Sequence, residues 1–150
     1  MGAVAQQRQL EAVVRRFAAI APAGWAHLVG SWEASTGADG RVSLNWITTA
    51  VVDGGDRWLH GQVRHDEALY DAVVRLNELS AQAAPEHRWT TLELHLDRDG
   101  TIRVDVGHEP PKRTRGVLDE ESLGRYERYL DTWVAAHGPV PPGASAAGGR

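Results

Sequence analysis

Apolar residues recur at three- and four-residue spacing in three separate stretches, and this period predicts three amphipathic helices. The first stretch covers residues 4–20. The second covers residues 66–83, where Asp66 is the expected N-cap and Pro85 follows the end of the helix. The third covers residues 120–137 and begins with acidic side chains, which the positive end of the helix dipole favours.

The segments between these helices alternate apolar and polar residues, which is typical of β-strands with one buried face. Residues 25–34 and 41–52 are predicted strands, and residues 57–63 form a shorter third one, with turns rich in Gly and Asp between them. The clearest alternation lies in residues 89–108, where two runs flank the turn at residues 97–100. This segment predicts a β-hairpin with one apolar and one polar face.

Short turns between consecutive strands predict a mainly antiparallel sheet. We therefore expect an α+β fold with the order α-β-β-(β)-α-β-β-α. Its four to five strands would pack against three helices in two layers. A length of 150 residues suits one domain, which we place at residues 1–138. Residues 139–150 are rich in Pro, Gly and Ala and are expected to form a flexible tail.

Composition excludes several classes of site. The chain has 16 Lys and Arg against 20 Asp and Glu, a net charge of −4, which argues against general nucleic-acid binding. It has no cysteine, which excludes disulfide scaffolds, thiolate zinc sites and a thiol nucleophile. We see neither a secretory signal nor an apolar run of membrane-spanning length. A cytoplasmic protein without a membrane partner is therefore expected.

Histidine is the first residue type to consider for catalysis, with seven copies in the chain. His60, His65, His95 and His108 have acidic neighbours, but no pair has the HExxH spacing of a zinc helix. The motifs of serine nucleophiles and of phosphate-binding loops are also missing from the sequence. We therefore expect no cofactor and no metal, and we interpret the basic run at residues 112–115 as a solvated loop. A small metal-binding or hydrolytic enzyme that uses His and acidic residues on the sheet remains an alternative.

The polar face of the predicted hairpin is the candidate surface for a protein partner. Charged side chains on its two strands can pair across the hairpin and still face outward. Tryptophan is unusually common, with six copies, and it is a frequent anchor residue at interfaces. The candidate partner-binding residues are Trp32, Trp58, Glu93, His95, Asp97, Asp99, Arg103 and Asp105.

Several residues occur in an order that matches a known family. Trp25 opens the first predicted strand, and Trp89 leads into LELHLDRDGTIRVDV, which contains an acidic Gly turn. The segment RYERYLDTW then places Arg125 and Trp133 on the closing helix. Over residues 5–138 this layout resembles the YezG-like immunity proteins of bacterial polymorphic toxin systems.

The resemblance implies a small cytoplasmic α+β protein that binds and neutralises a toxin domain, often a nuclease. The leading hypothesis is therefore a non-enzymatic inhibitor that blocks the active site of its partner by steric and electrostatic means. A mildly acidic chain suits a basic nuclease surface. A structural or adaptor domain that uses the Pro-rich tail as a tether is a further alternative, and the oligomeric state stays open.

Overall fold

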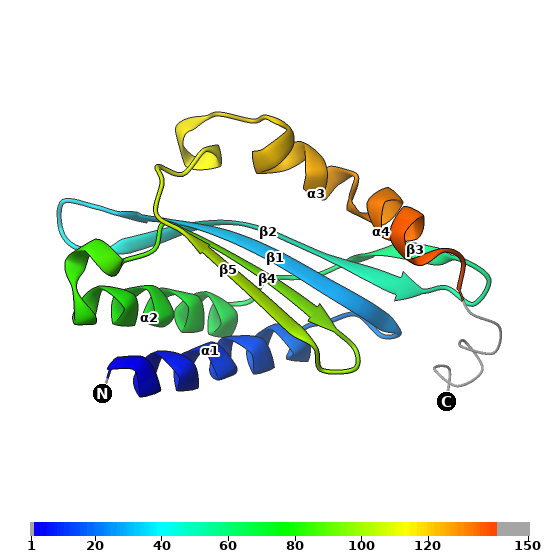
Figure 1. Cartoon of the computed structure of the whole chain (residues 1–150), viewed down its shortest axis with the longest axis horizontal. Coiled ribbons are helices and arrows are strands. Elements are labelled where there is room, and N and C mark those ends of the chain that lie inside the picture. The colour runs from blue at the N-terminus through cyan, green and yellow to red at the C-terminus, as the bar shows by residue number, and fades with distance from the viewer. Residues whose placement is uncertain (1, 141–150) are drawn as a thin grey trace.

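The computed structural model describes residues 2–140, so most of the predicted tail at residues 139–150 lies outside the described residues. Figure 1 shows the arrangement of the helices and strands. The elements are α1 (Gly2–Ala19), β1 (Trp25–Thr36), β2 (Val42–Asp53), β3 (Trp58–Gln62), α2 (Glu67–Ala83), η1 (Pro85–His87), β4 (Thr91–Asp97), β5 (Ile102–Gly107), η2 (Arg113–Arg115), η3 (Glu120–Gly124), α3 (Arg125–Glu127) and α4 (Tyr129–His137).

The five strands form one antiparallel sheet in the order β3-β2-β1-β4-β5. The α+β class and the mainly antiparallel sheet are thus confirmed, and the short third strand is present. β1 lies at the centre and pairs with β2 on one side and β4 on the other. The predicted helix start at Asp66 is also confirmed, because its carboxylate accepts a hydrogen bond of 2.9 Å from the N–H of Leu69.

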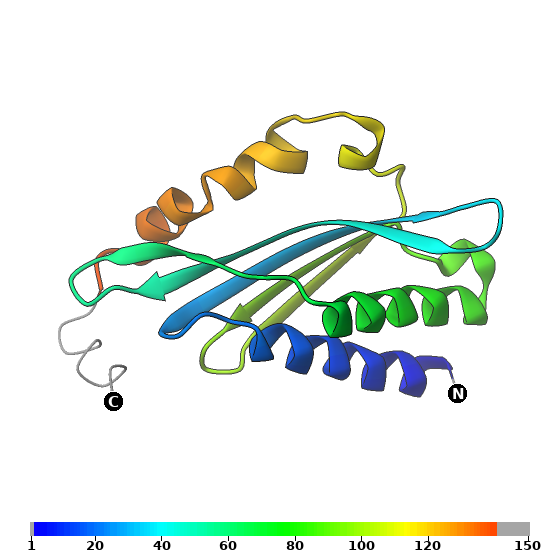
Figure 2. The same ribbon diagram turned by 180° about the vertical axis from the view of Figure 1, so that it is seen from behind.

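The hydrophobic core lies between the sheet and the helices α1 and α2, which cover the same face (Figures 1 and 2). Phe17 of α1 meets the edge of the Trp32 ring from β1, with the ring centroids 5.5 Å apart. Gly30 leaves room for this indole, since a Cβ at that position would lie 2.3 Å from a ring atom of Trp32. The alternating leucines of β4 complete this face of the sheet.

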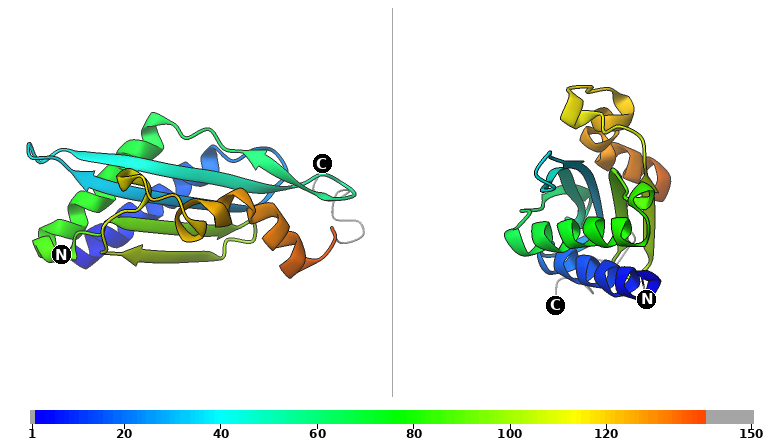
Figure 3. Two further views of the ribbon diagram at one scale, coloured as in Figure 1. Left: turned by 90° about the horizontal axis from the view of Figure 1, so that it is seen from above. Right: turned by 90° about the vertical axis from the view of Figure 1, so that its left-hand side faces the viewer.

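The opposite face of the sheet is also covered, which the two-layer prediction missed. Residues 109–138, which we call the C-terminal segment, run back across this face and form a third layer (Figures 1 and 3). The predicted helix at residues 120–137 is divided into a π-helical turn, a single α-helical turn and α4. The division falls at Arg128, whose backbone leaves the helical region with φ −100° and ψ 18°.

Candidate functional site between the sheet and the C-terminal segment

The site is built on the face of β1 and β4 that points away from α1 and α2. Strand alternation sends every second side chain to this face, and on these two strands most of those side chains are polar. We call this surface the polar face. Its central members are His27, Ser31, Glu33, Glu93, His95 and Asp97.

Glu33 fixes the start of the C-terminal segment to the sheet. Its carboxylate accepts hydrogen bonds from the backbone N–H groups of Lys112, Arg113 and Thr114 at 3.1, 3.0 and 2.9 Å. The Thr114 hydroxyl donates a further bond of 2.9 Å. Burial alone would raise the pKa of Glu33, but these hydrogen bonds outweigh it and lower the pKa below its usual value. Glu33 is therefore ionised at neutral pH, although only 4% of its surface is exposed.

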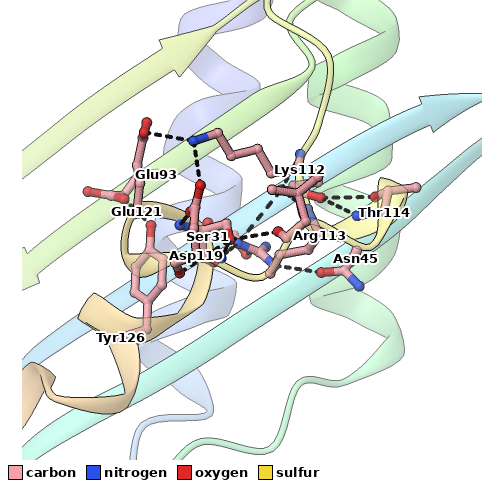
Figure 4. Close-up of polar contacts among 12 residues, drawn as sticks. Ser31, Asn45, Glu93, Lys112, Arg113, Thr114, Asp119, Glu121 and Tyr126 are labelled. Atoms are coloured by element: carbon pink, nitrogen blue, oxygen red, sulfur yellow. Dashed lines mark hydrogen bonds and ion pairs between the residues drawn. The ribbon is translucent and has the colours of Figure 1, made fainter.

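Arg113 provides the opposite charge and donates hydrogen bonds to three further residues (Figure 4). Its side chain is 6% exposed, and Nη1 lies 3.9 Å from the Glu33 carboxylate. The guanidinium donates to the Asn45 side chain at 2.7 Å, to the Ser31 hydroxyl at 3.2 Å and to the Ser122 carbonyl at 3.0 Å. Since the buried charges of Glu33 and Arg113 are paired and hydrogen-bonded, this cluster joins the segment to the sheet and offers no free reactive group.

Glu93 forms the second cluster, under the η3 turn and α3. Oε1 accepts from Arg125 at 2.5 Å and from the Tyr126 hydroxyl. Oε2 lies 2.8 Å from His95 Nε2 and 3.6 Å from Arg103. Burial would raise the pKa of Glu93, but the hydrogen bonds of His95, Arg125 and Tyr126 together lower it strongly. Glu93 is thus charged at neutral pH, and its two carboxylate oxygens are both engaged.

His27 forms the third cluster with Asp97 and Tyr129. Nδ1 of His27 lies 2.7 Å from the Asp97 carboxylate, and Nε2 lies 2.7 Å from the Tyr129 hydroxyl. His95 adjoins the same pair, with Nδ1 at 3.2 Å from His27 Nε2 and at 3.2 Å from the Tyr129 hydroxyl. The Trp133 ring covers His27, with the ring centroids 4.7 Å apart. Together these groups form a continuous hydrogen-bonded chain from Asp97 to Glu93.

Burial determines the protonation states of His27 and Tyr129 in this series of hydrogen bonds. Burial lowers the pKa of His27 below its ordinary 6.5, although Asp97 partly opposes the shift. A neutral His27 donates its Nδ1 proton to Asp97 and accepts the Tyr129 hydroxyl at Nε2. Burial also raises the pKa of Tyr129 to about 12, so its hydroxyl keeps its proton. A carboxylate, a histidine and a hydroxyl are aligned, but the phenol is a poor nucleophile at neutral pH.

Two open clefts border these clusters and share Arg125. The first, of about 540 Å³, lies over the Glu93 cluster and the loop after β5. The second, of about 490 Å³, is bordered by His27 and His95 of the sheet and by Tyr129, Thr132, Trp133 and Ala136 of α4. Both have the size of small-ligand sites. The Tyr129 hydroxyl and the ring nitrogens of His27 and His95 are, however, already hydrogen-bonded within the molecule, whereas the buried Nε1 of Trp133 has no partner among the described residues.

Three predicted site residues are not on an open surface. Trp32 is fully buried in the core, and its Nε1 donates to His65 at 2.9 Å, so the expectation of a surface anchor at Trp32 is corrected. Glu93 and His95 have side chains only 13% and 12% exposed, because the C-terminal segment lies over them. The basic run was interpreted as a solvated loop, and that interpretation is wrong for Arg113, which the polar face buries.

Most of the other predicted residues lie on the hairpin, whose β4–β5 turn is at one end of the sheet. Asp97 and Asp99 are at the turn, whereas Arg103 lies opposite His95 and Asp105 lies opposite Glu93 farther along the hairpin. The side chains of Arg103 and Asp105 are 64% and 62% exposed. The expected cross-strand contact is present, since Arg103 lies 2.9 Å from His95. Trp58 reaches the same end through α4, where its ring meets Trp133 edge to face at 6.0 Å and its Nε1 donates to the Gly138 carbonyl at 2.9 Å.

Several residues of the site were not selected from the sequence, namely His27, Glu33, Arg113, Arg125, Tyr126 and Tyr129. One signal was available. Residues 25–34 place His27, Ser31 and Glu33 at alternate positions, which is unusual for the central strand of a sheet unless the polar face is covered by partners. The residues of the C-terminal segment that contact the polar face have no local sequence pattern that indicates this role.

The histidines considered for a metal site lie apart from one another. His60 contacts the Thr49 hydroxyl at 2.7 Å, His65 accepts from Trp32, and His108 lies 3.3 Å from the His87 carbonyl. Within residues 2–140, no three His, Asp or Glu side chains are placed to hold one metal ion. In the same part of the chain, no helix is both long and apolar enough to cross a membrane.

No family model matches the chain, and no curated protein matches it at a significant level.

Proposed function

We propose that this protein is a cytoplasmic, non-enzymatic protein-binding domain of the immunity type, which blocks a bacterial toxin domain. One observation carries the proposal. Both ring nitrogens of His27 and His95 are engaged inside the molecule, whereas Asp97 at the turn and Arg103 and Asp105 on β5 keep exposed charged side chains. A general base needs a free lone pair within reach of its substrate, and a docking surface needs exposed charge on a rigid support.

The docking surface lies at the end of the sheet where the β4–β5 turn meets α4. Asp97 and Asp99 lie on the turn, and Asp97 keeps a side chain 41% exposed although it also holds His27. The second cleft opens beside them, with the aromatic rings of Tyr129 and Trp133 as its apolar wall. Acidic groups around an aromatic depression suit a partner that inserts a basic or aromatic side chain.

The mechanism is steric and electrostatic. A net charge of −4 favours encounter with a basic partner such as a nuclease domain. The rigid network under the hairpin end keeps the surface preorganised, because the turn and α4 are joined through Asp97, His27 and Tyr129. Binding over the partner's catalytic groups then excludes its substrate.

Two steps test the proposal. The tagged protein is first captured from its own cells, and a stoichiometric partner that ends in a toxin domain is identified by mass spectrometry. That domain is then expressed in a sensitive bacterium together with variants of the protein. Ala136→Arg places a long basic side chain at the border of the second cleft, and Ala135→Arg changes the neighbouring exposed position, which does not border it.

We expect the wild-type chain and Ala135→Arg to restore growth, and Ala136→Arg to weaken binding at least about tenfold and to lose protection. Both substitutions suit an exposed helix position, so equal stability of the two variants in thermal unfolding is the control. Equal protection by both variants would contradict this docking surface. Recovery of the protein without a partner, in cells that express the toxin, would contradict the function.

A further inference from the structure

The free edge of β5 is a second surface that the polar face does not use. The strand order puts β5 at the rim of the sheet, and Figure 3 shows no ribbon of the described residues beyond it. Ile102 and Val106 point to the same side of the sheet as the buried leucines of β4, yet they are 47% and 54% exposed. An edge strand with exposed apolar residues is a template for pairing with another strand.

The register of the hairpin determines which backbone groups are free. Asp97 and Thr101 share a hydrogen bond of 2.9 Å at the turn, and their positions are opposite in the β4–β5 register. Hydrogen-bonded positions recur at every second residue of an antiparallel pair. Arg103 and Asp105 therefore direct their backbone groups toward β4, whereas Ile102, Val104 and Val106 direct theirs to the open edge.

The side chains of β5 are complementary to those of a second β5 that runs antiparallel to it. When Val104 lies opposite Val104, Ile102 lies opposite Val106, and Arg103 lies opposite Asp105. The Val104 pair lies on the two-fold axis and occurs once, and each of the other two pairs occurs twice. Apolar residues then meet apolar residues on the helix side of the sheet, and opposite charges meet on the other side.

We propose that two copies of this chain associate through antiparallel pairing of β5 with β5, with Val104 on the two-fold axis. The sheet of one copy continues into the sheet of the other. The free N–H and C=O groups of Ile102, Val104 and Val106 are satisfied, and the exposed apolar side chains at Ile102 and Val106 are covered. The backbone edge of β5 is separate from the cleft border at Ala136 of α4, although Arg103 lines the second cleft as well. The pairing of the two edges does not depend on the proposed function.

Charge selects this register over its neighbours. A shift by two residues in one direction puts Arg103 opposite Arg103, and a shift in the other direction puts Asp105 opposite Asp105. Both place like charges directly across the pair, which is unfavourable. A shift by one residue would set the apolar side of one strand against the charged side of the other.

Single-cysteine variants test the register, because the natural chain has no cysteine. In a hydrogen-bonded antiparallel pair, opposite Cα atoms lie about 5.5 Å apart, within the range of a disulfide. Val104→Cys should therefore form a covalent dimer under mild oxidation. Ile102→Cys is the matched control on the same strand, since its counterpart is Val106 and its own copy is too distant. Mixing Ile102→Cys with Val106→Cys should restore cross-linking.

Charge exchange tests the affinity. Arg103→Asp and Asp105→Arg each turn two attractive contacts into two repulsive ones and should weaken self-association about tenfold, as measured by sedimentation over a range of concentrations. A mixture of the two variants, and the double variant Arg103→Asp/Asp105→Arg, should recover the dimer. Near-unchanged circular dichroism of each variant confirms that the fold is kept.

Two results would overturn the inference. The first is a wild-type chain that sediments as a monomer at all concentrations up to about 0.5 mM, where even weak edge pairing would be visible. The second is equal cross-linking of Val104→Cys and Ile102→Cys, which would mean random collision. A dimer that persists unchanged in Arg103→Asp and in Asp105→Arg would also reject β5 as the interface.

Discussion

At the scale of single residues, the buried carboxylate of Glu33 attaches the C-terminal segment to the sheet. It lies on the central strand, where a carboxylate without partners would cost several kcal/mol. Three backbone N–H groups, the Thr114 hydroxyl and the nearby Arg113 guanidinium compensate this cost. Since the partners lie about 80 positions along the chain, the residue determines where the C-terminal segment begins to cover the sheet.

Replacing Glu33 with Gln tests this role. The change keeps the shape of the side chain but leaves the buried Arg113 charge uncompensated, so we expect the free energy of unfolding to fall by about 3 kcal/mol. Urea unfolding followed by circular dichroism measures it. Glu78→Gln on the exposed side of α2 is the matched control, with an expected change below about 0.5 kcal/mol. A loss as small as that of the control would contradict the fastening role.

At the scale of elements, the C-terminal segment is held at several points although its helices are short. Its η3 turn begins with a capping box, in which the Asp119 carboxylate accepts from the Ser122 N–H at 2.9 Å and the Ser122 hydroxyl accepts from the Asp119 N–H at 3.0 Å. Lys112 also donates to Asp119 at 3.0 Å. The hydrogen bond from the Ser122 backbone, with that of Lys112, lowers the pKa of Asp119 to about 2.

Two substitutions at Asp119 separate the cap from the charge. Asp119→Ala removes both, and we expect faster amide exchange throughout residues 117–127, because the loss of an N-cap destabilises the turn that it begins. Asp119→Asn keeps an acceptor for the Ser122 N–H and should lose much less, because an exposed ion pair contributes little. Exchange in β1 and β4 serves as the internal reference. Equal effects of the two substitutions would mean that the ion pair with Lys112, not the cap, holds this turn.

At the scale of the whole molecule, three titratable groups with shifted pKa values lie on the polar face. His27 resists protonation because of burial, whereas Glu33 and Glu93 resist it because hydrogen bonds outweigh burial. In the unfolded chain these groups return to ordinary pKa values of 6.5 for His and 4.5 for Glu. As the pH falls, the unfolded chain therefore binds protons before the folded chain does, first near pH 6.5 and then near pH 4.5. Because protons bind the unfolded state preferentially, acid destabilises the fold in two stages.

Unfolding in urea at a series of pH values measures these stages. The free energy of unfolding should fall as the pH drops below 6.5, through His27 and also through His65, whose pKa burial likewise lowers. It should fall again below pH 4.5, because the stabilisation by Glu33 and Glu93 is complete above that value and is lost as their folded-state pKa values are approached. Glu33→Gln should reduce the second stage. A free energy of unfolding that stays constant between pH 8 and about 3.5 would contradict the assignment.

Much of the fold could be predicted because its signals are local. The apolar period defined α1 and α2, and alternation defined the β4–β5 hairpin with its contact between His95 and Arg103. The site was predicted only in part. Asp97 and Arg103 were selected as polar residues of the hairpin, but their actual neighbours His27, Tyr129 and Arg125 come from distant segments.

The sequence by itself determined which residues prefer a helix or a strand and which side of each element is apolar, because these properties depend on neighbours a few positions away. Only the tertiary structure decided what covers the polar face. The contacts from His27 to Tyr129 and from Glu33 to Arg113 join positions 102 and 80 residues apart. No local period encodes such a pairing, since it arises only when the folded sheet presents a row of buried polar groups that the C-terminal segment can satisfy.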